Sequence, residues 1–340
     1  MASTPAMTIS DALGSMPNVI EQTLGERVLE KCLSAASLPS DISAHQGSFI
    51  PEIALDAFLE TAAREAGDAF WGLVLAPHLS VMEYGDWGDY VLQAPDLVSS
   101  LKRAINTLYL HASEDRLALL RGPRSTKFQY MFGERSGRGY HQIALSALGP
   151  MLSIPKHFLG SNWMPLAIDI DFGNLATAKH IEKELQCKTR SEMQCLAIEI
   201  PNDVLLTKNP VDPRTWTTLR DVEKACKGGP PEGIVSIVEM LVSQKLGVDG
   251  LTLDDVAKTL AMSRRTLQRR LDQQGTDFRR VMGFVKMRRA RDLLVETPAS
   301  VSEIGAFLNY STSSHFARAF KREYGVSPVA YRAEQCRAYS

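Results

Sequence analysis

The sequence of 340 residues predicts two domains. The first is an N-terminal domain of the α/β or α+β class, and the second is an all-α domain with two helix-turn-helix units joined by a long helix. Three observations predict this: a short helical pattern that occurs twice after residue 250, a segment rich in glycine and proline before it, and a change in the sign of the net charge. We expect domains over residues 1–226 and 234–340, with a linker over 227–233.

The overall composition, with 44% hydrophobic and 23% charged residues, is typical of a soluble globular protein. The longest apolar stretches are shorter than the roughly 20 residues that a membrane-spanning helix needs. The N-terminal segment lacks the basic start and apolar core of a signal peptide. The 5 cysteines are an odd number without CxxC spacing, which favours reduced thiols. We therefore expect a cytoplasmic protein that does not associate with membranes.

The charges are distributed unevenly along the chain. Residues 251–340 contain 16 Lys and Arg against 9 Asp and Glu, a net charge of +7. The rest of the chain contains 22 basic and 30 acidic residues, a net charge of −8, so the total of −1 conceals the difference. A basic segment beside an acidic one indicates a module that binds nucleic acid.

In the N-terminal domain, apolar residues at helical spacing alternate with short runs typical of strands. We expect helices over residues 53–66, 97–110, 141–158 and 175–185. We expect strands over residues 116–121, 127–132, 166–170 and 193–200, the first two paired across Gly122-Pro123-Arg124. Helices interleaved with strands are typical of α/β and α+β folds.

The linker Lys227–Gly233 contains Gly-Pro and Pro-Pro steps, which disfavour both helix and strand. Residues 234–242 then show helical spacing and predict the first helix of the C-terminal domain.

Capping residues predict the first helix-turn-helix unit. Thr252 precedes one helix, with an acidic residue three positions later, and Ser263 precedes the next. The expected inward residues are Val256, Ala257, Leu260, Leu267 and Leu271. The expected outward residues of the second helix are Arg264, Arg265, Gln268 and Arg269. Because arginine pairs with guanine and glutamine with adenine in the major groove, these four residues are candidates for DNA contacts.

A helical pattern of about 20 residues follows from Thr276 to Glu296, with a length on the order of 30 Å. Successive major-groove faces of DNA lie about 34 Å apart. The helix therefore has the length to hold two DNA-binding units one turn apart. Thr297-Pro298 ends it, and Ser300 with Glu303 forms a capping box for the second unit.

The second unit repeats the first, with Ser311 expected to open its second helix. Its expected core residues are Ile304, Leu308, Phe316 and Phe320. Its candidates for DNA contacts are Thr312, Ser313, Ser314, His315, Arg318 and Lys321. Because hydroxyls distinguish bases less sharply than arginine does, we expect more phosphate contact and less base discrimination here. Ser327-Pro328 begins a closing helix.

The second unit also contains the residues of a known signature. They are Ser311, Ser314, Phe316, Arg318-Ala319-Phe320-Lys321-Arg322, Gly325-Val326-Ser327-Pro328 and Tyr331-Arg332, with Met262-Ser263, Leu267 and Arg269 upstream. In these residues the C-terminal domain resembles the AraC/XylS family of transcriptional regulators. The resemblance implies a cytoplasmic, sequence-specific regulator, usually an activator, that binds promoter-proximal double-stranded DNA and contacts RNA polymerase. It places base contacts on Arg265, Gln268, Arg269, Ser313, Ser314 and Arg318.

One feature departs from the family pattern. The family usually has glycine in the turn where this chain has Asn309, and Ala261 takes the equivalent place in the first unit. Asparagine tolerates left-handed backbone, whereas alanine does so at a higher energy. The first turn is therefore expected either to be strained or to differ slightly in conformation.

The element order of the N-terminal domain, together with the segment from Tyr84-Gly85-Asp86-Trp87-Gly88 to Leu97, resembles the arabinose-binding-type domain of some family members. The resemblance implies that this domain binds a small-molecule effector, forms a homodimer, or does both. The candidates for the effector pocket are Trp71, Trp87, Tyr90, Tyr130, His141 and Trp163.

The sequence indicates no enzyme, cofactor or metal site. It lacks a glycine-rich phosphate loop, G-x-S-x-G, HExxH and clustered Cys and His residues. Some family relatives couple this DNA-binding unit to cysteine-based repair, but Cys187 and Cys195 lack the neighbours for that chemistry. Two hypotheses remain: a regulator in which effector binding shifts the population that binds DNA, and a regulator without a ligand that is controlled by abundance or by a protein partner.

Overall fold

The computed structural model describes residues 4–42, 47–211, 216–246 and 251–338. The chain forms two compact units, which we call the N-terminal unit (Pro5–Pro230) and the C-terminal unit (from Pro231 onward). The boundary lies in a segment where Lys227, Gly228 and Gly229 have positive φ angles. None of the described helices combines the length and the apolar character that a membrane span requires.

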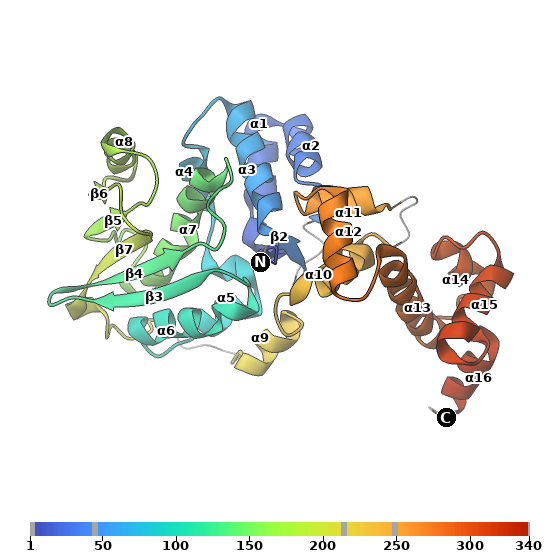
Figure 1. The fold of residues 1–340 in the computed structure, drawn as a ribbon. Coiled ribbons are helices and arrows are strands. Elements are labelled where there is room, and N and C mark those ends of the chain that lie inside the picture. The colour runs from blue at the N-terminus through green and yellow to red at the C-terminus, as the bar shows by residue number, and fades with distance from the viewer. Residues whose placement is uncertain (1–3, 43–46, 212–215, 247–250, 339–340) are drawn as a thin grey trace. The chain divides into compact units, whose positions relative to one another are not determined.

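The N-terminal unit begins with a two-stranded sheet and a group of helices (Figure 1). Strand β1 (Met7–Ile9) pairs antiparallel with β2 (Phe49–Pro51). The helices are α1 (Met16–Leu24), α2 (Glu26–Ala35), α3 (Glu52–Ala66) and α4 (Trp71–Leu75). They share one buried apolar cluster, in which Ile20, Phe58 and Leu59 are fully buried. This cluster holds the N-terminus of α3 in place.

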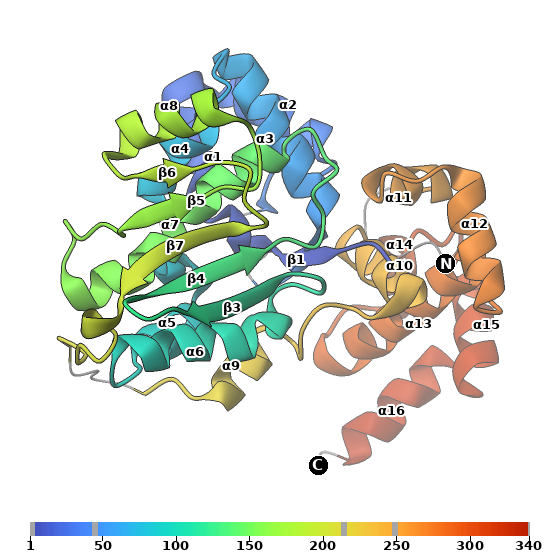
Figure 2. The same cartoon turned by 60° about the vertical axis from the view of Figure 1, so that its left-hand side comes forward.

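A five-stranded sheet forms the other half of this unit (Figure 2). Its strands are β3 (Arg116–Arg121), β4 (Ser125–Met131), β5 (Ala167–Asp169), β6 (Thr189–Arg190) and β7 (Leu196–Pro201). The order is β3-β4-β7-β5-β6, and every pair except β5–β6 is antiparallel. The predicted mixed fold class is confirmed, and the largely antiparallel sheet is of the α+β kind.

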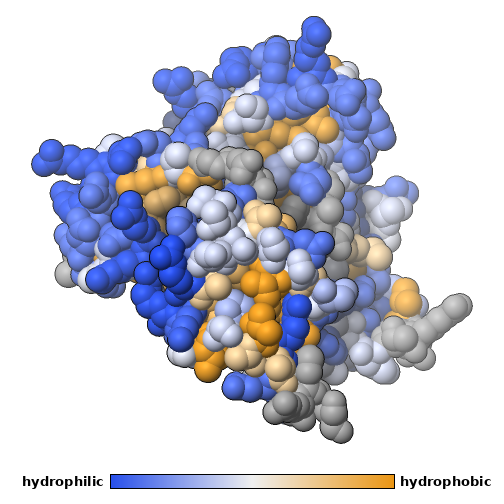
Figure 3. Space-filling view, turned by 90° about the vertical axis from the view of Figure 1, so that its right-hand side faces the viewer, coloured by the Kyte–Doolittle hydropathy of each residue, from blue (hydrophilic) through white to orange (hydrophobic). Residues whose placement is uncertain are grey.

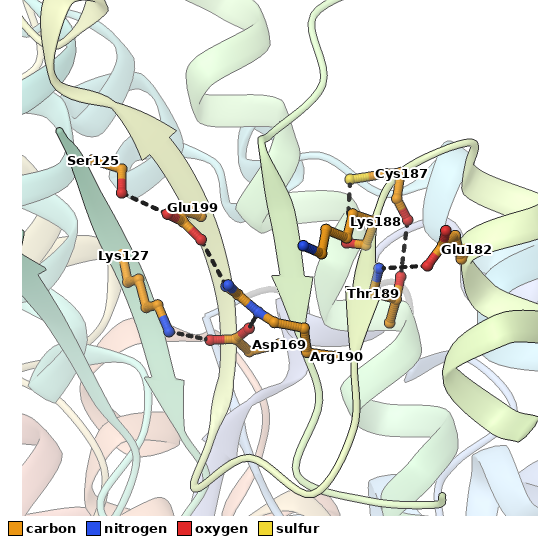
Figure 4. Close-up of polar contacts among 9 residues, drawn as sticks. All are labelled: Ser125, Lys127, Asp169, Glu182, Cys187, Lys188, Thr189, Arg190 and Glu199. Atoms are coloured by element: carbon orange, nitrogen blue, oxygen red, sulfur yellow. Dashed lines mark hydrogen bonds and ion pairs between the residues drawn. The ribbon is translucent and has the colours of Figure 1, made fainter. Parts of the chain in front are cut away.

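The two faces of the sheet differ because successive side chains of a strand point to opposite sides. Phe128, Ile168 and Ile198 are buried on one face, and helix α7 (Tyr140–Leu159) packs against β7. The other face holds a polar network, shown in Figure 4. Asp169 bridges Lys127 at 2.7 Å and Arg190 at 2.5 Å, and Arg190 also binds Glu199 at 2.7 Å. The apolar face is therefore the one available for a cavity.

Several elements of the N-terminal unit were not predicted. These are the strands β1, β2 and β6 and the helices α1, α2, α4, α5 (Asp86–Leu92) and α9 (Leu219–Ala225). Gly25, at φ 91°, separates α1 from α2. Helices this short are marginal by themselves and depend on tertiary burial, so their local pattern was weak. The predicted helix 97–110 is α6 (Leu97–Thr107) followed by a 3₁₀ turn, and helix 175–185 is α8 (Leu175–Leu185).

The C-terminal unit is entirely helical. Its helices are α10 (Gly233–Gln244), α11 (Leu253–Thr259), α12 (Arg264–Gln273), α13 (Phe278–Glu296), α14 (Val301–Phe307), α15 (Ser313–Tyr324) and α16 (Pro328–Ala338). Helix α13 contacts α10, α14, α15 and α16. The long helix predicted between the two helix-turn-helix units is thus present, and it is the central element of the unit.

Most predicted helix caps are confirmed. Thr252 forms a capping box with Asp255, Ser300 forms one with Glu303, and Ser263 Oγ accepts the Thr266 amide at 3.1 Å. The prediction for α15 was wrong by one residue. Its N-cap is Thr312, whose hydroxyl accepts the amide of His315 at 3.1 Å. Ser311 instead pairs with the His315 ring at 3.0 Å.

Both helix-turn-helix turns adopt the left-handed conformation, with φ 49° at Ala261 and φ 58° at Asn309. The first turn therefore keeps the geometry that favours glycine although it has alanine. An L-residue in this conformation costs about 1–2 kcal/mol, and asparagine is among the residues that tolerate it best.

Ala261→Gly is therefore expected to stabilise the first helix-turn-helix by about 0.5–1 kcal/mol, after allowance for the greater freedom of glycine in the unfolded chain. Hydrogen exchange of α11 and α12 in the full chain would measure it. Asn309→Gly in the second turn is the matched control, and it should increase protection from hydrogen exchange in α14 and α15 by a smaller amount. Faster exchange in α11 and α12 of the Ala261 variant would contradict a strained turn.

Candidate nucleic-acid interface and ligand cavity

Each helix-turn-helix is held by a small apolar core. In the first, Val256 and Ala257 of α11 and Leu267 and Leu271 of α12 are buried. In the second, the buried residues are Ile304, Leu308, Phe316 and Phe320. A Cβ atom added to Gly305 would lie 3.2 Å from Phe316 Cβ, so glycine lets α14 approach α15 closely. These cores position the opposite faces of α12 and α15.

All ten residues predicted to contact DNA are exposed to solvent. On α12, Arg265, Gln268 and Arg269 share one face because they are three and four positions apart. Arg264 differs, since its guanidinium forms an ion pair with Asp254 of α11 at 2.8 Å. The outer surface of α12 thus presents two arginines and a glutamine. Figure 3 looks onto the side of the C-terminal unit, where hydrophilic residues cover much of the surface.

The exposed face of α15 is less basic. Ser314, Arg318 and Lys321 follow one another at helical spacing on this helix. Thr312 and His315 are exposed as well, but the Thr312 hydroxyl caps the helix and the His315 ring pairs with Ser311. Their polar groups are therefore partly occupied by local contacts, as is the Arg264 guanidinium of α12, whereas no such contact is recorded for Arg265, Gln268 and Arg269 among the described residues.

Helix α13 sets the separation of the two helix-turn-helix motifs within the C-terminal unit. Its 19 residues correspond to roughly 28 Å, somewhat less than the ~34 Å between successive major-groove faces of DNA. Arg332 of α16 fastens its end, because Nε donates to Leu294 O at 2.8 Å and Nη2 donates to Ala299 O at 2.6 Å. The first bond satisfies a carbonyl in the last turn of α13, which a helix end leaves without a partner, and the second reaches the segment between α13 and α14.

The N-terminal unit contains a cavity of about 100 Å³. It lies between the apolar face of the sheet, represented by Phe128 and Tyr130, and side chains of α3, α5 and α7. Acidic side chains also line it: Asp11, Glu52, Asp56, Glu83, Asp115 and Glu134. The lining thus combines aromatic and apolar groups with a concentration of carboxyl groups.

The structure brings two of the six predicted effector-site residues, Trp87 and Tyr130, to this cavity. The other four lie elsewhere. Trp71 is buried in the cluster of α1 to α4, and the Arg103 guanidinium covers the Tyr90 ring at 4.6 Å. His141 stacks on Phe172 at 5.0 Å, and Trp163 is half-buried in the segment before β5.

Sequence reasoning missed the acidic residues of the cavity. Glu52 is the first residue of α3, where an acid is ordinarily explained by the helix dipole, and Asp115 immediately precedes β3. Neither position gives a local signal for a binding site. His111 and Tyr84 were also missed, although Tyr84 belongs to the segment that supported the family resemblance.

Glu52 and Asp115 interact inside the cavity. Asp115 accepts two hydrogen bonds, from Tyr130 OH at 2.6 Å and from the Gly133 amide at 2.8 Å. Burial raises its pKa. Glu52 Oε1 is buried without a hydrogen-bond partner in the described protein. Burial, followed by the charge of Asp115, raises the pKa of Glu52 to about 9. Glu52 is therefore largely protonated at neutral pH.

His111 lies beside these acids as a neutral imidazole. It is 2% exposed, and burial lowers its pKa to about 3. Its Nε2 lies 3.5 Å from the sulfur of Cys226, whereas Nδ1 is buried and has no partner among the described residues. Within those residues, no three His, Cys, Asp or Glu groups are arranged to hold a metal ion.

Comparisons with known proteins match both units. Residues 28–209, more than half of the chain, match the arabinose-binding domain of AraC transcription regulators, and residues 256–334 match a helix-turn-helix domain. The ornithine utilization regulator of Pseudomonas aeruginosa is 24% identical over 271 residues, which are 78% of this chain and 79% of that protein. An HTH-type transcriptional regulator of Mycobacterium tuberculosis is 43% identical over 97 residues, only 28% of each chain.

Among solved structures, the transcriptional regulator CdpR from Pseudomonas aeruginosa is 18% identical, with a TM-score of 0.40 over 91% of this chain and 98% of that one. The matched families and relatives are transcription regulators and not enzymes.

Proposed function

This chain belongs to the family of AraC transcription regulators, and from that premise we propose that it controls transcription at promoter-proximal sites in response to a small molecule bound in the N-terminal cavity. The helix-turn-helix domain identifies double-stranded DNA as its partner. The DNA-binding residues would be those exposed on α12 and α15.

The observation that supports this proposal most directly is the pair of exposed polar helices joined by α13. Helix α12 presents Arg265, Gln268 and Arg269 without a competing ion pair within the described residues. These side chains have the donors and acceptors that distinguish base pairs in the major groove. The hydroxyls and cations of α15 are better suited to phosphate.

The cavity supports the ligand-responsive hypothesis over control by abundance alone. Buried polar atoms without partners are unusual in a folded protein, and Glu52 and His111 bring two of them to one enclosed space. A molecule that binds there would shift the balance between conformations of different DNA affinity. We further propose an activator that acts as a cytoplasmic homodimer and contacts RNA polymerase, as the family resemblance implies.

Selection of DNA fragments by the full chain tests the proposal. It is expected to enrich one sequence that contains two half-sites. Arg269→Ala should then weaken binding to that sequence by about 1–3 kcal/mol, roughly 5- to 150-fold, and relax the preference at one base pair.

Arg289→Ala is the matched control, since Arg289 is an exposed arginine of α13 in the same unit. It should leave the base preference unchanged. A loss in Arg269→Ala that is equal on all sequences would reassign Arg269 to phosphate contact. Failure of the full chain to enrich any sequence would contradict the proposed function.

A further inference from the structure

We propose that the N-terminal cavity selects a small primary amine without a carboxylate, and that the ammonium group binds Glu52 while the apolar part lies against the sheet and α7. The inference rests on the proposed function, because the amine would be the molecule to which the regulator responds.

The charge of the walls is the first reason. Six acidic side chains line the cavity, whereas among the residues that the structure describes no lysine or arginine does. Some of the acids are engaged locally: Asp11 accepts the Gly47 amide at 3.0 Å, and Glu83 accepts the Ser80 amide at 3.2 Å. An organic cation would be attracted by the remaining carboxyl groups. A carboxylate would meet other carboxyl groups and, in the described lining, no lysine or arginine, so amino acids are disfavoured together with simple acids.

The second reason is the pair of buried atoms without partners. Glu52 is 7% exposed and has a buried oxygen, Oε1, without a hydrogen-bond partner in the described protein, and His111 likewise has a buried Nδ1; both residues line the cavity. If the His111 proton is on Nε2, toward Cys226, then Nδ1 is a hydrogen-bond acceptor. A primary ammonium has three N–H donors, which complement a carboxylate and an imidazole nitrogen. A quaternary ammonium has no donor and would leave both acceptors unsatisfied.

The aromatic walls add a third reason. The rings of Tyr84 and Trp87 lie 5.4 Å apart, and those of Trp87 and His111 lie 4.5 Å apart. The Trp87 indole is held by a 2.7 Å hydrogen bond from Nε1 to Thr107 Oγ1. The faces of tryptophan and tyrosine attract cations, so a fixed ring beside the acids favours an ammonium further.

The remaining walls and the volume define the body of the ligand. Leu55, Phe128, Met151 and Ile154 provide an apolar surface. An apolar cavity of about 150 Å³ holds benzene, so a cavity of about 100 Å³ suits a short alkyl chain. Pentylamine is therefore an appropriate probe, and pentanol, pentanoate and L-norvaline are matched analogues that lack the cation or add a carboxylate.

Isothermal titration of the full chain tests the proposal. Pentylamine is expected to bind at least 10-fold more tightly than each of the three analogues. Glu52→Gln keeps the shape but removes the carboxylate, so it should weaken pentylamine binding at least 10-fold. Glu60→Gln, which is on the same helix but outside the cavity, should bind like the wild type.

A second measurement on the wild-type protein does not depend on any variant. Glu52 is surrounded by the acids Asp115, Glu134 and Glu114 and by the Tyr130 phenol, and its pKa of about 9 keeps it protonated at pH 7.5. Binding of an ammonium to the carboxylate must then release close to one proton. Titrations in buffers of different ionisation enthalpy measure this release. Affinity should rise with pH up to about 9.

Three outcomes would overturn the inference: equal binding of pentanol, pentanoate or L-norvaline, an unchanged affinity in Glu52→Gln, or no proton release. Failure of the inference differs from failure of the proposed function. A chain that selects DNA but does not bind pentylamine retains the regulatory role with another ligand. A chain that binds pentylamine but selects no DNA refutes the regulatory role.

Discussion

Phe316→Ala is expected to destabilise the second helix-turn-helix by about 3–5 kcal/mol, because it removes a fully buried ring from a closely packed core. The Phe316 ring lies 5.5 Å from that of Tyr310 and 6.0 Å from that of Phe320. The close approach of Gly305 leaves little scope for the neighbours to fill the space. Hydrogen exchange of α14 and α15 in the full chain would measure the loss directly.

Phe307→Ala provides the matched control. Phe307 is 44% exposed at the end of α14, so the same substitution creates no internal cavity there. It should change exchange in α14 and α15 only slightly. Phe316→Ala should also weaken binding to the selected DNA, because α15 would lose its position. Equal protection from hydrogen exchange in the two variants would show that this core does not hold the second helix-turn-helix together.

DNA binding by the full chain is expected to depend steeply on salt. If about six phosphates are neutralised, affinity should fall about 10³-fold between 50 and 200 mM salt. The physical reason is the net charge of +7 over residues 251–340, with exposed cations on both α12 and α15. Titrations of the selected DNA at several salt concentrations would give the slope.

Two lysine substitutions test which unit causes the dependence of DNA affinity on salt concentration. Lys321→Gln on α15 should reduce it by about 1, the amount expected for one phosphate contact. Lys179→Gln removes an exposed lysine from α8 in the N-terminal unit and should leave the slope unchanged. A salt response that is flat, or that changes equally in both variants, would contradict the assignment of DNA binding to the C-terminal unit.

The C-terminal helices were predictable because their signals are local. Caps at Thr252, Ser263 and Ser300 act within three residues, and helical spacing of apolar residues separates the inward from the outward positions. The shift of one residue at Thr312 arose because two adjacent hydroxyl residues compete for the same role. The conformation at Ala261 could not be predicted from the sequence either, and only the structure shows that this turn keeps the left-handed backbone.

The N-terminal unit was less predictable because several of its elements depend on contacts between distant parts of the chain. Its strands β3 and β4 were found from pattern and turn, yet α1 and α2 were missed because their stability depends on the shared cluster with α3. The six aromatic and histidine candidates for the effector site were chosen by residue type, and only Trp87 and Tyr130 line the cavity.

The sequence by itself thus determined the family of the chain, the two helix-turn-helix units and the residues that their helices expose, since caps, periodicity and charge are properties of neighbouring residues. Tertiary structure alone decided which residues line the cavity. Glu52, His111 and Asp115 belong to different segments, and each is unremarkable in its own stretch of sequence. Folding brings them to one cavity, where burial raises the pKa of Glu52 and of Asp115 and lowers that of His111, an effect that no local pattern reveals.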